Sequence, residues 1–131
     1  MKILLAEDDK VENRLLEHYL VDRGFTVSSV FDAESAWRAA EKDVPDVILL
    51  DLHMPGGTGL GFLKRRGASS RLRSVPVIVI TAMDDPLVRR MAEQHGVETV
   101  FTKPVDLFLL DVSLEGIRSR LTPRTPVPPG A

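Results

Sequence analysis

Five apolar runs of strand length recur along the chain, and each is followed by a stretch that can form a helix. Several of the runs are almost continuously apolar, which is typical of strands whose two faces are both covered by helices. The alternation predicts a doubly wound α/β fold, with five helices around a five-stranded parallel sheet in the order 2-1-3-4-5. The expected strands are Ile3–Ala6, Phe25–Val30, Val47–Leu50, Val75–Ile80 and Thr99–Phe101.

Residues typical of helix ends mark most of the helices between these strands. Asp9, Asp32 and Asp106 are predicted N-caps, and Asp85 is an N-cap followed by proline at the first helical position. The third helix is the least well defined, because glycines crowd its ends. Gly24 and Gly96 are expected to end the first and fourth helices. The apolar residues of the first helix that share one helical stripe are Val11, Leu15, Leu16, Tyr19 and Leu20.

The length of 131 residues fits one domain, which can bury a core without disulfides or structural metals. We assign this domain to residues 1–121 and interpret residues 122–131 as a proline-rich tail or the start of a linker. Cysteine is absent, which excludes thiolate zinc sites and thiol redox chemistry and is compatible with the cytoplasm, the expected location. The apolar start is too short for a signal peptide or a membrane span.

The charge of the chain does not favour nucleic acid as a ligand. A net charge of -2 provides no general electrostatic attraction to phosphate backbones, so direct nucleic-acid binding is not expected. Basic residues gather between positions 64 and 73, but no aromatic residues interleave them. We expect this basic cluster to be solvated surface; it consists of Lys64, Arg65, Arg66, Arg71 and Arg73.

Acidic residues follow two of the predicted strands directly. Glu7 and Asp8 come after the first strand, and Asp51 comes after the third. These strands are neighbours at the switch point of the expected sheet, where ligands bind beyond the carboxyl ends, so the three acids should meet. Packed carboxylates repel one another unless a cation holds them, and an all-oxygen ligand set favours Mg²⁺.

Two further strand ends supply groups that phosphoryl chemistry requires. Thr81 ends the fourth strand with a hydroxyl donor, and Lys103 follows the fifth strand with a mobile positive charge. An aspartate beside a metal and a lysine can act as a nucleophile and form an aspartyl phosphate. Asp51 is the best placed nucleophile, because it lies centrally at the end of the most apolar strand.

Together these motifs resemble the receiver domains of response regulators in two-component signalling. The resemblance covers about residues 1–121 and rests on Glu7-Asp8, Asp51-Leu52-His53-Met54-Pro55 with Gly59, Thr81-Ala82 and Lys103-Pro104. It implies a flavodoxin-like, chemotaxis-regulator-like fold. It also implies that Asp8, Asp51 and the backbone carbonyl of His53 bind Mg²⁺, with Glu7 acting through water. Thr81 and Lys103 would bond the phosphoryl oxygens, and the Lys103-Pro104 peptide is expected to be cis.

The resemblance also implies a role and partners. Asp51 would accept a phosphoryl group from a sensor histidine kinase or a phosphotransfer protein. The chain would be a switch that assists its own phosphorylation and dephosphorylation, not an enzyme with a separate substrate. A downstream protein or a C-terminal effector domain would read the switch, a phosphorylation-dependent homodimer is one form of output, and no membrane contact is expected. We expect the side chains of His53 and Met83 to flank the site and tune the lifetime of the phosphoryl group.

One position departs from the family pattern. Many receivers carry an aromatic residue three positions before the lysine, and its rotation accompanies activation; here Val100 occupies that position. The adjacent Phe101 cannot replace it without a bulge or register shift, because successive strand side chains point to opposite faces. Three alternative functions remain open: a pseudo-receiver that acts by contact alone, a flavodoxin-like enzyme that holds FMN, and a free-standing phosphohydrolase.

Overall fold

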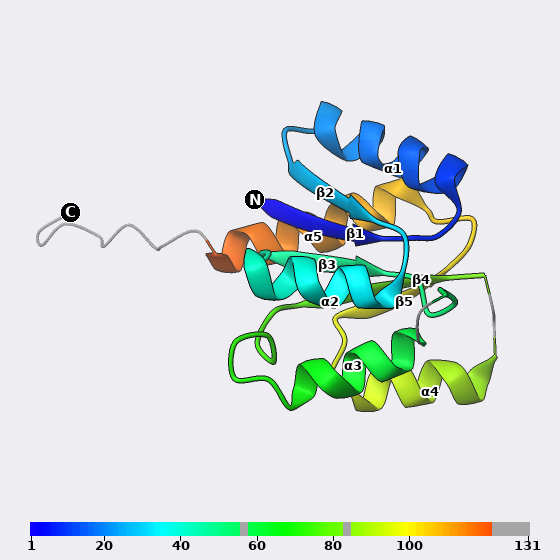
Figure 1. Ribbon diagram of the computed structural model, residues 1–131. Coiled ribbons are helices and arrows are strands. Elements are labelled where there is room, and N and C mark those ends of the chain that lie inside the picture. Colours follow the sequence, from blue (N-terminus) through cyan, green and yellow to red (C-terminus); the bar gives the residue numbers. More distant parts are fainter. Residues whose placement is uncertain (56–57, 83–84, 122–131) are drawn as a thin grey trace, which may run out of the picture.

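The computed structural model describes residues 1–55, 58–82 and 85–121. Five parallel strands form one sheet in the order β2-β1-β3-β4-β5, which confirms the predicted topology (Figure 1). The strands are β1 (Lys2–Ala6), β2 (Thr26–Val30), β3 (Val47–Leu50), β4 (Val77–Thr81) and β5 (Thr99–Thr102). The helices are α1 (Lys10–Asp22), α2 (Ala33–Lys42), α3 (Gly59–Gly67), α4 (Pro86–Gln94) and α5 (Leu107–Leu121).

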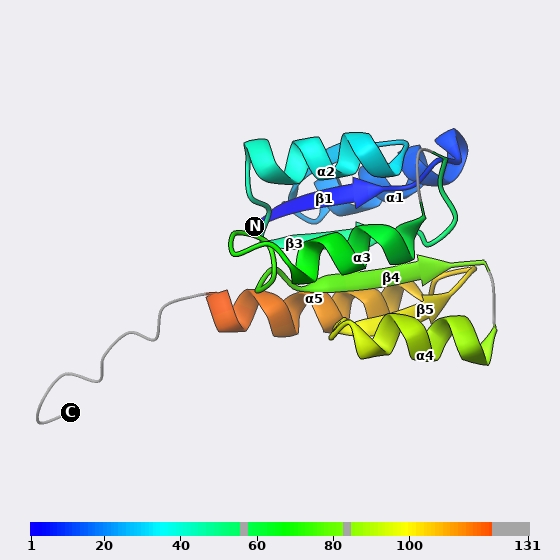
Figure 2. The ribbon, with the colours of Figure 1, turned by 60° about the horizontal axis from the view of Figure 1, so that its bottom comes forward.

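Helices cover both faces of the sheet, with α1 and α5 on one side and α2, α3 and α4 on the other (Figures 1 and 2). Consecutive residues of β1 contribute to different cores: Leu4 packs in the cluster with Trp37 and Phe62, whereas Leu5 packs in the cluster with Leu110. Burial on both faces explains why the three central strands, β1, β3 and β4, are almost continuously apolar in sequence. The doubly wound architecture is confirmed.

The predicted helix caps are confirmed. Carboxylate oxygens of Asp9, Asp32, Asp85 and Asp106 each accept a hydrogen bond from a backbone N–H in the following helical turn. Gly24 and Gly96 have φ angles of 89° and 72°, a conformation that glycine adopts without steric cost. For α3, the least well defined helix in sequence, Thr58 provides the cap: its hydroxyl accepts from the backbone N–H of Gly61 at 2.9 Å.

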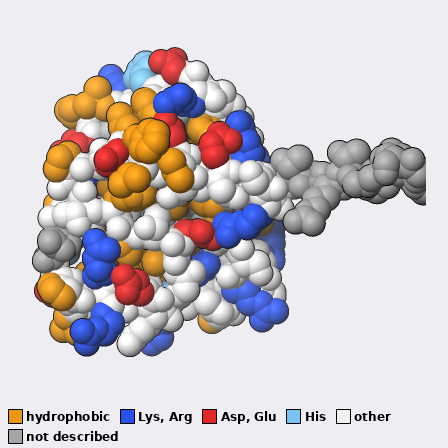
Figure 3. Space-filling view, turned by 180° about the vertical axis from the view of Figure 1, so that it is seen from behind, with side chains coloured by type: hydrophobic (Ala, Val, Ile, Leu, Met, Phe, Trp, Pro, Cys, Tyr) orange, Lys and Arg blue, Asp and Glu red, His pale blue; other side chains and the backbone are white. Residues whose placement is uncertain are grey.

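The apolar stripe of α1 is buried only in its second half. Val11 and Leu15 are 69% and 67% exposed, whereas Leu20 is fully buried. In this first half of α1 the buried side chain is that of Asn13, whose amide donates to the backbone carbonyl of Glu7 at 3.0 Å. Hydrophobic side chains are consequently exposed on the face that α1 and α5 form (Figure 3).

The prediction that the basic cluster is solvated is wrong for Arg66, which is 5% exposed. Its Nε donates to the carbonyl of Val75 at 2.9 Å and its Nη1 to the carbonyl of His95 at 3.2 Å, so the guanidinium joins α3 to the segment before β4 and to the C-cap of α4. Burial lowers the pKa of this guanidinium. The other members are exposed as expected: Lys64, Arg65, Arg71 and Arg73.

Among the described residues, no helix is both long and apolar enough to cross a membrane. The proposed tail, residues 122–131, lies outside the described part of the chain, and so does Met83. The domain boundary at residue 121 therefore stays a prediction.

Candidate functional site

Three acids meet at the carboxyl edge of the sheet, as predicted. One carboxylate oxygen each from Glu7, Asp8 and Asp51 lie within 4.8 Å of one another. The parallel pairing of β1 with β3 sets Ala6 opposite Leu50, so the residues that follow them emerge side by side. The backbone N–H of Asp51 donates to the carbonyl of Ala6 at 3.0 Å. Glu7 and Asp51 are buried, while Asp8 is exposed.

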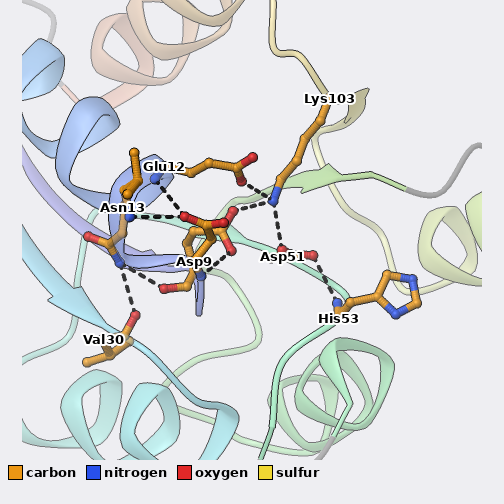
Figure 4. A network of polar contacts seen from close by, with 9 residues as sticks. Asp9, Glu12, Asn13, Val30, Asp51, His53 and Lys103 are labelled. Carbon is orange, nitrogen blue, oxygen red and sulfur yellow. Dashed lines mark hydrogen bonds and ion pairs between the residues drawn. The ribbon is translucent and has the colours of Figure 1, made fainter.

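The ammonium of Lys103 lies among these acids (Figure 4). It donates to Oδ2 of Asp51 at 3.0 Å, to Oε2 of Glu12 at 2.7 Å and to Oε1 of Glu7. The backbone N–H of Lys103 donates to the carbonyl of Thr81 at 2.9 Å, which aligns the end of β5 with the end of β4. The Lys103-Pro104 peptide is cis, as expected.

Thr81 and His53 stand at or beyond the carboxyl ends of β4 and β3. Thr81 is buried as the last residue of β4, the strand between β3 and β5. The backbone N–H of His53 donates to Oδ1 of Asp51 at 2.9 Å, and the exposed imidazole points away from the acids (Figure 4). The assignment of the His53 backbone carbonyl as a metal ligand stays a prediction.

The site carries more negative than positive charge. Burial, reinforced by Glu12 and Asp51, raises the pKa of Glu7 to about 8, although Lys103 opposes the shift. Burial of the Lys103 ammonium works against its charge, but the carboxylates of Glu12, Glu7 and Asp51 outweigh it and raise the pKa of Lys103. Lys103 likewise lowers the pKa of Glu12. Because one ammonium does not balance these carboxylates, the all-oxygen cluster fits a divalent cation such as Mg²⁺.

The raised pKa of Glu7 predicts how stability depends on pH in a metal-free buffer. The pKa in the folded protein is about 8, against about 4.5 when unfolded, so the folded state binds the extra proton between these values. The contribution of this proton on Glu7 to the free energy of unfolding is fully present below the unfolded pKa and is lost as the pH rises through about 8. Above that pH, Glu7→Gln should increase the free energy of unfolding by roughly 2 kcal/mol.

Urea denaturation with a chelator, from about pH 5 to about pH 9, measures this effect. The free energy of unfolding of the native chain should fall relative to that of Glu7→Gln across the range. If the free energies of unfolding of the two proteins changed in parallel with pH, the raised pKa of Glu7 would be contradicted.

Comparison with known proteins agrees with this geometry. A family model described as the response regulator receiver domain matches residues 3–115. The chain belongs to this family. The receiver is 35% identical over 109 residues to the response regulator PleD of Caulobacter vibrioides, an alignment that covers 83% of this chain and 24% of PleD. It is 30% identical over 122 residues to the phosphate regulon transcriptional regulatory protein PhoB of Escherichia coli, covering 93% of this chain and 53% of PhoB.

Solved structures agree as well. The Francisella response regulator 1452 receiver domain superposes on this receiver with a TM-score of 0.83 at 25% identity, covering 92% of this chain and 98% of that structure. By contrast, the receiver spans about a quarter of PleD and about half of PhoB. The similarity to the curated relatives therefore concerns the receiver and not the remaining parts of those proteins.

Sequence reasoning predicted one of two further features of this receiver and did not predict the other. The expected opposite orientations of Val100 and Phe101 are confirmed, since Val100 packs in the core beneath α2–α4 and Phe101 against the core beneath α1 and α5. The contact of Glu12 with Lys103 was missed. An acid in the first turn of a helix ordinarily interacts with the helix dipole, so only the position of Glu12 beside the β5 edge reveals the contact.

Proposed function

We propose that this receiver accepts a phosphoryl group on Asp51 and thereby switches the state of a downstream partner. The observation that carries the proposal is the buried Asp51 carboxylate, which is grouped with Glu7 and Asp8 and hydrogen-bonded to Lys103. A carboxylate in this setting can attack phosphorus, and the neighbouring Lys103 ammonium limits the charge that develops. Family membership favours this function over the FMN enzyme and the phosphohydrolase. The presence of the acids, the threonine and the lysine of the site favours it over the pseudo-receiver.

In the proposed reaction an Asp51 carboxylate oxygen attacks phosphorus as the bond from phosphorus to the donor breaks. The leaving group takes the electron pair; it is acetate from acetyl phosphate, or imidazole from a phosphohistidine. The Thr81 hydroxyl and the Lys103 ammonium then donate hydrogen bonds to the phosphoryl oxygens. We expect the lifetime of the product to depend on the side chains of His53 and Met83, which would control the access of water.

Mg²⁺ fits the oxygen ligands that the site offers, and when bound it would neutralise charge on the transferring phosphoryl group. Asp8, Asp51 and the backbone carbonyl of His53 would bind it directly, and Glu7 would act through a water molecule. With the metal bound, Glu7 and Asp51 would hold the Lys103 ammonium less tightly.

The partners follow from the same proposal. A sensor histidine kinase or a phosphotransfer protein supplies the phosphoryl group in the cytoplasm, and a separate protein or an effector domain reads the result. Phosphorylation can also act through a homodimer. The receiver makes no direct contact with nucleic acid or membrane. It assists its own phosphorylation and dephosphorylation and has no separate substrate.

Intact mass spectrometry after incubation with acetyl phosphate tests the proposal. The native chain should gain the mass of one phosphoryl group when Mg²⁺ is present and much less with a chelator, and Asp51→Asn should gain none. Equal gains in the native chain and the variant would mean that another residue accepts the group. Unchanged signalling by Asp51→Asn in cells would support the pseudo-receiver.

A further inference from the structure

A fourth acid, Glu12, contacts the lysine of the site without belonging to the group of Glu7, Asp8 and Asp51. Its Oε2 accepts from the Lys103 ammonium at 2.7 Å. Glu12 is held in the first turn of α1, where its backbone N–H donates to the Asp9 side chain at 3.0 Å. The contact therefore links the start of α1 to the segment that follows β5.

All donors of the lysine are in use. An ammonium has three N–H groups, and the Lys103 ammonium makes three hydrogen bonds, to Glu7, Glu12 and Asp51. A phosphoryl oxygen on Asp51 can therefore receive a bond from Lys103 only when one of these carboxylates releases it. The hydrogen bonds that Lys103 makes to these carboxylates therefore compete with those that it would make to a phosphoryl group on Asp51.

The three carboxylates differ in how strongly they hold Lys103 once a cation binds at the site. Glu7 and Asp51 belong to the cluster that fits a cation, so positive charge placed there weakens their hold on Lys103. Glu12 lies outside that cluster, and its side chain is half exposed. Its attraction for the ammonium consequently persists until the phosphoryl group itself displaces it.

We propose that Glu12 is a positioning residue that retains Lys103 beside α1 in the unphosphorylated receiver and slows phosphoryl acceptance at Asp51. This inference rests on the proposed function. On phosphorylation Lys103 leaves Glu12 for the phosphoryl oxygens, and the link between α1 and the segment after β5 is broken. Glu12 and Lys103 line one cavity of about 270 Å³ with Leu15 and Leu107, so the exchange alters the wall of a groove on the α1 side of the protein.

Two substitutions separate this role from simple charge repulsion. Glu12→Gln removes the charge and weakens the contact, whereas Glu12→Asp keeps the charge but shortens the side chain, so that the carboxylate withdraws from Lys103. If Glu12 retains the lysine, both variants release it. If Glu12 only repels an incoming anion, Glu12→Asp should behave like the native chain. Glu17→Gln, on the same helix but outside the hydrogen bonds of Lys103, is the matched control for charge.

The experiment measures the initial rate of phosphorylation by acetyl phosphate, followed by intact mass at saturating Mg²⁺. Glu12→Gln and Glu12→Asp should each react about 5-fold faster than the native chain, which is the size of effect expected for a half-exposed ion pair, and Glu17→Gln should not. In a Lys103→Gln background, Glu12→Gln should have no effect on the rate. That loss of effect distinguishes positioning through Lys103 from a structural role of Glu12 in α1.

Unchanged rates in both Glu12 variants would overturn the inference while leaving the proposed function intact. A faster rate in Glu12→Gln alone, or a gain that survives Lys103→Gln, would also overturn it, because the effect would then not pass through the lysine. If the native chain gains no phosphoryl group at all, the proposed function fails, and the inference fails with it. Circular dichroism of each variant verifies that α1 is retained.

Discussion

Substituting Gly59 with alanine should lower the free energy of unfolding by about 3 kcal/mol, because no space exists for the added carbon. A Cβ at this position would lie 2.5 Å from Cα of Leu52 and 2.8 Å from the carbonyl oxygen of Asp51. Both are backbone atoms of the segment that follows β3, so relief requires this segment to move. Asp51 would move with it, and we expect phosphorylation to slow as well.

Chemical denaturation measures the effect, and Gly116→Ala in α5 is its control. Nothing lies within 4 Å of a Cβ at Gly116, so alanine there should be neutral or stabilising by up to about 1 kcal/mol. Equal stabilities of Gly59→Ala and the native chain would show that the close packing of α3 on Asp51 and Leu52 does not constrain the site.

Asp8→Ala should reduce the rate of phosphorylation by acetyl phosphate at a fixed, limiting Mg²⁺ concentration by about 100-fold. Asp8 is the exposed member of the acidic cluster, so its loss should affect the metal site and leave the core intact. If Asp8 is a metal ligand as proposed, the remaining ligands would hold the cation more weakly without this carboxylate, and the charge on the transferring group would be less well neutralised.

The measurement is the rate of mass gain as Mg²⁺ is titrated, with Asp22→Asn at the far end of α1 as the control. The control should match the native chain. An Asp8→Ala variant with native rates and native dependence on Mg²⁺ would remove Asp8 from the metal site, whatever the role of Asp51.

Most of the fold and much of the site could be predicted because local sequence signals agree with the tertiary structure. Continuous apolar runs identified the strands, and aspartates before apolar stretches identified the caps, as for Asp32 and Asp106. The convergence of Glu7, Asp8 and Asp51 followed from the strand order, because residues that follow neighbouring parallel strands meet at one edge.

The remaining features depend on contacts between distant segments. Arg66 sits within a run of basic residues that predicts surface, and its burial follows from two carbonyl acceptors, those of Val75 and His95, which only the packed structure brings near. Val11 and Leu15 belong to an apolar stripe whose first half is exposed in the structure. Glu12 meets Lys103 across 91 positions of sequence, a pairing that no local pattern encodes.

The central claim, that Asp51 itself carries the phosphoryl group, is tested most directly by chemical localisation. Borohydride reduces an aspartyl phosphate to homoserine, so the chain treated with acetyl phosphate and Mg²⁺ can be reduced, digested and sequenced by mass spectrometry. Homoserine at position 51, dependent on Mg²⁺ and absent from the untreated chain, is the predicted result. Homoserine at position 8 or 9, or a phosphoryl group that stays on a hydroxyl or imidazole after reduction, would contradict the account.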